Sequence, residues 1–179
     1  MMNSRLFRII LAGAFVLANS NTVHADDIQD ANALLNKGQR TEALDTINHY
    51  LKSKPKDARA RFLQGLILYK QGQTEEAIKV YSTLIEDYPE MPEPYNNLAV
   101  LYSEQGEFIK ARQTLEMAIR DHPNYAIAHG NLADIYIKLA AVAYDRSLQL
   151  DRNNTLTQKK LALAEELLVL NKNTHSAKK

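Results

Sequence analysis

One set of residue types recurs along this chain at a fixed interval. Three successive units keep the same register, with glycine at 38, 72 and 106, alanine at 43, 77 and 111, and proline at 55, 89 and 123. A period of this length is typical of repeat proteins, in which each unit buries its apolar face only by stacking on the next. The period therefore predicts a stack of repeated units.

Each unit has the pattern of two helices joined by a short turn. In the second unit the apolar run over residues 62–69 has helical periodicity, and Gly72 offers the left-handed conformation that ends a helix. A second helix is expected over residues 74–87, where the small Ala77 lets the paired helix approach closely. Pro89 then ends this helix, because proline disfavours helical geometry at the preceding residue. The chain is therefore predicted to be all-α.

The third unit contains a complete series of bulky, small and aromatic residues at fixed positions: Tyr95, Leu98, Ala99, Tyr102, Gly106, Ala111, Leu115, Ala118 and Pro123. This series resembles the tetratricopeptide repeat (TPR) family, and the resemblance covers roughly residues 24–154. It implies an all-α, right-handed helical solenoid with three full helix-turn-helix repeats, a shortened fourth repeat and a C-terminal capping helix. The family's fold hosts many unrelated partners, so the resemblance indicates a fold more than a function.

The chain is expected to have three parts: a targeting segment, a repeat domain and a tail. Residues 1–25 combine Arg5 and Arg8, a short apolar run and a cleavage site ending at Ala25, which predicts a cleavable signal peptide. We expect a TPR domain at 26–170, with repeats at 24–57, 58–91, 92–125 and 126–154, a capping helix at 155–170, and a disordered polar tail at 171–179. The chain thus resembles small exported TPR proteins of Gram-negative bacteria. The periplasm is the expected location, with secretion or an N-terminal anchor as alternatives, and no membrane insertion is expected after cleavage.

The fourth unit matches the repeat only if five residues, including the turn glycine, are missing. No Gly or Pro occurs from Asn131 to Arg152, so the two helices are predicted to fuse into one rod of about 25 residues, roughly 38 Å long. The alternative is a tight turn near residues 138–141. The second half of a fused helix cannot fold back on its first half, and a shortened hinge is a known route to domain swapping. A homodimer is therefore a further hypothesis.

The sequence shows no constellation of residues typical of catalysis or metal binding. A net charge of +1 gives no electrostatic case for nucleic acid, and the absence of cysteine excludes disulfides and thiolate metal sites. No two histidines are spaced i, i+4, and no glycine-rich phosphate loop occurs. We therefore expect no enzyme activity and no cofactor.

In TPR proteins the first helices of the repeats line a concave face, and the resemblance implies ligand contacts at fixed positions of each repeat. In this sequence these positions give the partner-binding candidates Arg59, Phe62, Leu66, Tyr69, Lys70, Asn96, Asn97, Val100, Asn131, Asp134 and Lys138. Asn97 and Asn131 occupy the same position in successive units. An amide both donates and accepts hydrogen bonds, so this pair is expected to bind the backbone of an extended peptide. The alternative is that both amides are solvated surface groups.

The sequence therefore predicts a non-catalytic adaptor or scaffold in the bacterial envelope, which binds an extended peptide or protein segment on its concave face. Some TPR domains clamp a C-terminal carboxylate with Lys and Arg, but those positions hold Ile28, Glu93 and Asn97 here, so this activity is not expected. The alternative function is a self-assembling structural component that oligomerises through the fused fourth-repeat helix and the C-terminal helix.

Overall fold

The computed structural model describes residues 26–176, and this range holds eight α-helices and no strand. The helices are α1 (Asp26–Asn36), α2 (Arg40–Ser53), α3 (Ala58–Lys70), α4 (Thr74–Asp87), α5 (Pro92–Glu104), α6 (Phe108–Asp121), α7 (Ala126–Leu150) and α8 (Thr155–Ser176). The predicted signal peptide at residues 1–25 lies outside the described residues, as do residues 177–179 of the expected tail.

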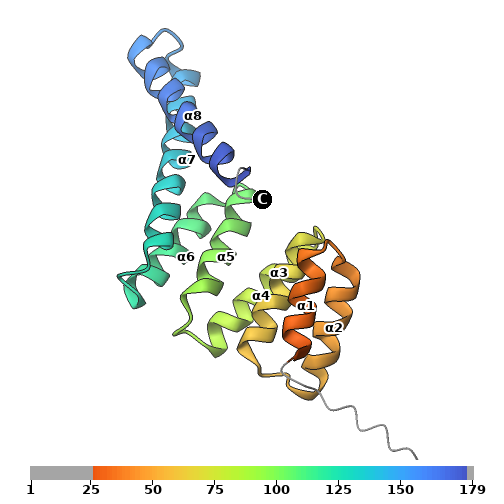
Figure 1. Cartoon of the computed structure of the whole chain (residues 1–179). Helices are drawn as coiled ribbons and strands as arrows, with labels where there is room; N and C mark the ends of the chain where they lie inside the picture. The colour runs from red at the N-terminus through yellow and green to blue at the C-terminus, as the bar shows by residue number, and fades with distance from the viewer. Residues whose placement is uncertain (1–25, 177–179) are drawn as a thin grey trace, which may run out of the picture.

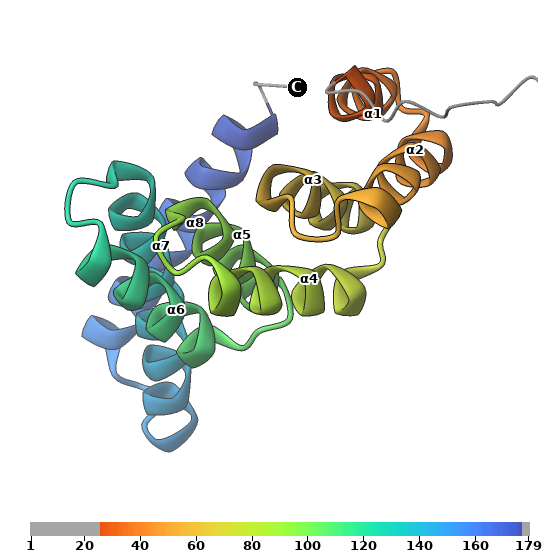
Figure 2. The same cartoon turned by 90° about the horizontal axis from the view of Figure 1, so that it is seen from below.

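The first six helices form three pairs that follow one another along the chain (Figure 1). Helix α1 packs on α2, α3 on α4 and α5 on α6, and α2 and α4 in turn contact the pair that follows them. Seen from below, α1, α3 and α5 lie along the inner side of a curved row, and α2, α4 and α6 lie along its outer side (Figure 2). The predicted all-α solenoid is confirmed.

The turn inside each pair is built on the recurring glycine of the repeat. Gly38, Gly72 and Gly106 have φ angles of 79°, 81° and 78°, a left-handed conformation that costs residues with a Cβ roughly 1–2 kcal/mol. The residue after each glycine donates its backbone N–H to a carbonyl five residues earlier, as from Gln73 to Leu68 at 2.9 Å. This closing bond caps the first helix and directs the chain into the second.

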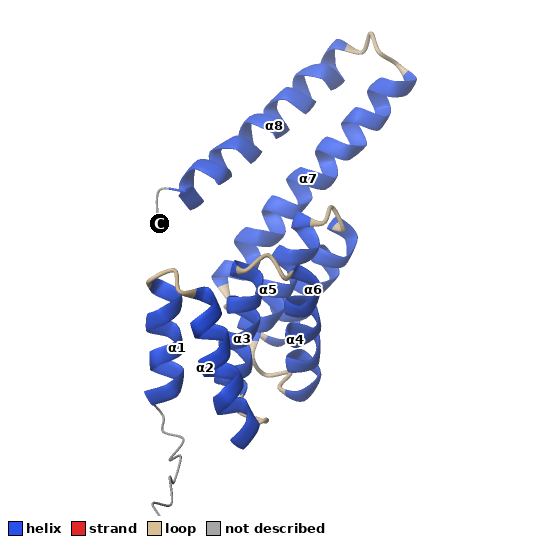
Figure 3. Ribbon diagram, turned by 90° about the vertical axis from the view of Figure 1, so that its right-hand side faces the viewer, coloured by secondary structure: helices blue, strands red, loops and turns tan. Residues whose placement is uncertain are grey.

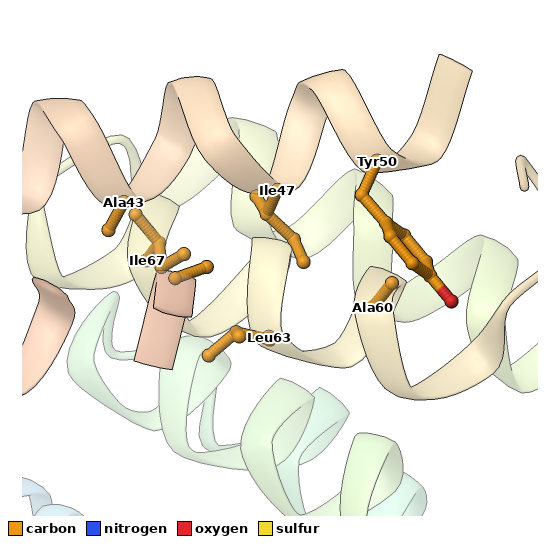
Figure 4. Close-up of a cluster of buried hydrophobic side chains, with 7 residues drawn as sticks. Ala43, Ile47, Tyr50, Ala60, Leu63 and Ile67 are labelled. Atoms are coloured by element: carbon orange, nitrogen blue, oxygen red, sulfur yellow. The ribbon is translucent and has the colours of Figure 1, made fainter. Parts of the chain in front are cut away.

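Small buried residues allow the helices to approach closely. Ala43, Ala77 and Ala111, which occupy the same position in successive repeats, are all 0% exposed. The cluster at the N-terminal end of the stack shows how larger side chains fill the space beside them (Figure 4). There, the α2 side chains Ala43, Ile47 and Tyr50 meet the α3 side chains Ala60, Leu63 and Ile67.

Asp57 fixes the start of the second repeat. Its Oδ1 accepts hydrogen bonds from the backbone N–H groups of Arg59 and Ala60 at 3.0 and 3.1 Å, and its Oδ2 accepts one from the Tyr50 hydroxyl at 2.8 Å. Burial alone would raise the pKa of the Asp57 carboxyl, but the hydrogen bonds from Ala60 and Tyr50 outweigh burial and lower this pKa. The carboxylate therefore caps α3 and ties it to the end of α2.

Gly65 lies where α3 packs against the Tyr81 ring of α4. A Cβ at Gly65 would lie 2.8 Å from two ring carbons of Tyr81, whose side chain is 1% exposed and has little room to move. Gly130 in α7 is also helical, but nothing lies within 4 Å of its corresponding Cβ position. Comparing the same substitution at Gly65 and at Gly130 therefore isolates the effect of crowding on stability from the effect of helix propensity.

We expect Gly65→Ala to leave the protein less stable than Gly130→Ala by about 1–3 kcal/mol, the usual cost of overpacking. Both substitutions gain the same helix propensity, about 1 kcal/mol, so this gain cancels in the comparison. Urea denaturation of the two variants measures the difference. Equal stabilities would mean that α3 and α4 are farther apart than the structure shows.

The fourth unit is one continuous helix, α7, of 25 residues, which confirms the predicted fusion and excludes the turn at residues 138–141. Helix α8 runs back along α7, and the two project beyond the three helix pairs (Figure 3). Helix α8 continues to Ser176, past the expected end at Leu170. Residues 171–176 are thus helical rather than a disordered tail, because they contain no Gly or Pro that would end the helix.

Candidate binding face

Four of the predicted partner-binding residues converge on one shallow pocket. Leu66 and Tyr69 come from α3, and Asn97 and Val100 come from α5. The pocket has a volume of about 70 Å³ and is completed by Tyr81 and Leu101. It therefore spans two successive repeats and combines an apolar lining with one amide and two phenol groups.

The asparagines form a chain of hydrogen bonds across three helices. Asn131 on α7 donates from Nδ2 to Oδ1 of Asn96 at 2.6 Å, and Asn96 donates from Nδ2 to Oδ1 of Asn97 at 3.4 Å. Asn97 then donates from Nδ2 to the hydroxyl oxygen of Tyr81 at 3.1 Å. Each amide has two donor hydrogens and two acceptor lone pairs, so this chain fixes the side chains and leaves hydrogen-bonding capacity for a ligand.

The two tyrosines at the pocket are neutral at physiological pH. Burial raises the pKa of Tyr81 to about 12, and the hydrogen bond from Asn97 opposes this shift without reversing it. Burial also raises the pKa of Tyr69 to about 12, helped by Glu104, whose Oε1 accepts the Tyr69 hydroxyl at 2.6 Å. The Tyr81 hydroxyl, which accepts from Asn97, keeps its own proton for donation to a ligand.

The other predicted residues surround the pocket or lie away from it. The Phe62 ring packs on Tyr81, with 5.7 Å between ring centroids, and the Lys70 ammonium lies 5.8 Å from the centroid of the Tyr69 ring. Lys138 reaches from α7 to the Ser103 hydroxyl on α5, and Arg59 is exposed in the first turn of α3. The half-buried Asp134 follows Asn131 by one turn of α7.

The sequence prediction missed two residues that line the pocket, Tyr81 and Leu101. Both occupy positions that the repeat pattern assigns to the core, and both are 1% exposed. Tyr81 belongs to a second helix, whereas the prediction considered only first helices. Gly65 is the sequence feature that could have indicated Tyr81. Because Gly65 has no side chain, the Tyr81 ring of α4 can lie against α3 and extend to the inner face.

A metal site or a membrane-spanning helix would indicate other functions. Between residues 26 and 176, no group of three or more His, Cys, Asp or Glu side chains is placed to hold a metal ion. In the same range, no helix has the length and apolarity needed to cross a membrane.

Two family models match this chain, one for a TPR repeat at residues 65–106 and one for a tetratricopeptide repeat at residues 96–153. A search of curated protein sequences finds no match. The stacked helix pairs with glycine turns define a helical-repeat protein of the solenoid class. The chain belongs to the tetratricopeptide repeat family.

Solved structures share this fold at low sequence identity. YrrB, a TPR protein described as having an unusual peptide-binding site, is 24% identical with a TM-score of 0.55, over 58% of this chain and 54% of its own. PilF of Pseudomonas aeruginosa is 21% identical with a TM-score of 0.58, over 77% and 65%. SycD, a type III secretion chaperone of Yersinia enterocolitica in complex with a YopD peptide, is 19% identical with a TM-score of 0.59, over 66% and 98%. The chain thus spans about half the length of YrrB, and the likeness concerns the fold alone.

Proposed function

We propose that this protein is a non-catalytic adaptor that binds an extended peptide or protein segment on its inner face. The observation that carries the proposal is the pocket of Leu66, Tyr69, Tyr81, Asn97, Val100 and Leu101, which continues into the hydrogen-bonded asparagines. The pocket can receive one apolar side chain of the ligand. The amides beside it can hydrogen-bond the ligand backbone, whose N–H and C=O groups are free when the peptide is extended.

Two of the related structures support a peptide as the ligand. YrrB is described by its peptide-binding site, and SycD holds a peptide of its translocator. Because these proteins share only the fold with this chain, the argument for the ligand depends on the pocket itself. The neutral tyrosines and amides favour an uncharged stretch of peptide over one that is recognised through its charge.

The proposed location is the periplasm, and it rests on the signal-peptide pattern of residues 1–25. Secretion and an N-terminal anchor are the alternatives. Cell fractionation followed by N-terminal sequencing tests the location. A periplasmic protein that begins at Asp26 is expected, and an uncleaved protein in the cytoplasm would contradict the proposal.

The binding proposal is tested by selecting peptides from a random library on the purified protein and measuring their affinities. We expect the double variant Asn97→Ala/Asn131→Ala to bind the selected peptides at least about tenfold more weakly. This loss corresponds to about 1.4 kcal/mol, comparable to one or two hydrogen bonds. The matched control is Asn124→Ala/Asn153→Ala, which removes two exposed asparagines from loops. No enriched peptide, or equal losses in the two double variants, would contradict the proposal.

A second function, self-assembly, is favoured by a separate observation. Nearly all of the exposed large apolar side chains between residues 27 and 170 lie on α7 and α8, including Tyr136, Val142, Leu150, Leu156, Leu163 and Leu167. Apolar surface gathered on one projecting pair of helices is typical of an interaction surface. The second candidate function is therefore self-assembly through the apolar surface of α7 and α8.

A further inference from the structure

One position of the repeat is buried in three units and exposed in the fourth. The small residues Ala31, Gly65 and Ala99, at the same position of successive repeats, are buried where the first helix of each pair meets its second helix. The next member of this series is Ala133 on α7, and it is exposed. Tyr136 is likewise 49% exposed, whereas its counterpart Tyr102 is half-buried. The first half of α7 therefore has the packing face of a first helix without a second helix over it.

The residues of the missing second helix are present in the second half of α7. The five residues missing at the hinge shorten the spacing between the third and the fourth repeat by five. The α6 residues Ala111, Leu115 and Ala118 therefore correspond to Ala140, Tyr144 and Ser147 in α7. In α6 these three residues are at most 1% exposed, but in α7 all three counterparts are only partly buried. Both halves of the fourth repeat thus keep their packing residues, and the continuous helix holds them apart.

Helix α8 does not supply the missing cover. Three buried residues occupy one position of successive repeats, where a first helix packs on the second helix of the preceding repeat. They are Leu101, Ile135 and Ala164, with exposures of 1%, 3% and 7%. Helix α8 therefore stands in the place of the first helix of a fifth repeat, against the second half of α7. Even there the packing is loose, since an open hollow of about 270 Å³ lies between Ala140, Tyr144 and the α8 residues Leu163 and Leu167.

The open face adjoins the established core of the stack. Leu132 and Leu139 pack against the buried cluster of Tyr95, Ala99, Ala111 and Ile135, and Ala133 and Tyr136 follow Leu132 along the same helix. A helix laid on Ala133 would therefore extend an existing apolar interface. In the second repeat Tyr81, which follows the small Ala77 by one turn of α4, meets Gly65 of the first helix. Ala140 and Tyr144 provide this spacing.

We propose that two copies of this chain complete each other's fourth repeat. The second half of α7 in each copy lies antiparallel on the first half of α7 in the other, so that Ala133 of one copy faces Ala140 and Tyr144 of the other. The exchange is reciprocal and two-fold symmetric, as expected when a shortened hinge keeps a helix pair from closing within one chain. It is independent of the proposed peptide binding, since it uses a different face of the stack.

The first test restores the hinge. The sequence of residues 106–110, Gly-Glu-Phe-Ile-Lys, is inserted between Leu139 and Ala140, and the masses of both purified proteins are measured by light scattering. We expect the wild-type protein to reach twice the monomer mass as its concentration rises, and the insertion variant to remain a monomer. A wild-type protein that is monomeric at its highest soluble concentration, or a dimer that the insertion leaves intact, would overturn the proposal.

The second test traps the contact in the double variant Ala133→Cys/Ala140→Cys, because the native chain has no cysteine. Seven residues of one helix span about 10.5 Å, beyond the roughly 7 Å that a disulfide can bridge between Cα atoms, so a bond between these positions must join two copies. Mild oxidation is expected to give a covalent dimer on non-reducing electrophoresis, and Ala133→Cys alone is expected to form no covalent dimer, because Ala133 of one copy faces Ala140 of the other and not its own counterpart. Failure to form the dimer, or a disulfide within one chain, would overturn the proposal.

Discussion

Replacing Tyr81 by alanine is expected to lower the free energy of unfolding by about 3–5 kcal/mol, the usual cost of removing a buried aromatic ring. The Tyr81 side chain is 1% exposed, packs on Phe62 and fills the space left by Gly65. Its hydroxyl also accepts the hydrogen bond that ends the asparagine chain. Removing the ring therefore opens a cavity between the second and third repeats and frees Asn97.

Thermal and urea denaturation measure this loss, and Tyr81→Phe is the matched control. The phenylalanine ring fills the same volume, so only the hydrogen bond to Asn97 is lost, at a cost of about 0.5–1.5 kcal/mol. If Tyr81→Ala and Tyr81→Phe were equally stable, the ring would not be the packing element that the structure shows.

The second large effect concerns binding. Val100→Arg is expected to weaken peptide binding at least about 100-fold, or about 2.7 kcal/mol, because Val100 lines the pocket and a charged side chain there occupies the place of the ligand. The control is Met117→Arg, on an exposed position of α6 that does not line the pocket. Isothermal titration calorimetry with one selected peptide measures both variants. Equal affinities for the two would place the ligand elsewhere.

Much of the fold follows from local chemistry in the sequence. Gly38, Gly72 and Gly106 predict the turns because only glycine adopts their positive φ at no steric cost, and the structure has those angles. The fusion of α7 is predictable for the same reason, since the hinge of the fourth unit at residues 138–141 has no residue suited to a turn. The helix bounds of the first three repeats follow from these turns and from the prolines. The end of α8 was not predictable in this way, because a polar composition alone does not end a helix.

The binding face was only partly predictable, because it depends on distances between helices. The repeat pattern placed Leu66, Tyr69, Asn97 and Val100 on one face, and these four line the pocket. The pattern could not show that Asn131 would donate to Asn96, because these residues are far apart in sequence and meet only once α5 and α7 are packed. It also could not show that the ammonium of Lys138, another candidate ligand contact, donates to the Ser103 hydroxyl on α5.

Methyl NMR of the purified protein, titrated with a selected peptide, tests the central claim most directly. The methyl groups of Leu66, Val100 and Leu101 line the proposed pocket, and those of Leu156 and Leu163 report on the exposed face of α8. Binding on the inner face predicts large shifts for the first group and unchanged signals for the second. Shifts confined to α8, with Leu66 and Val100 unaffected, would contradict peptide binding on the inner face.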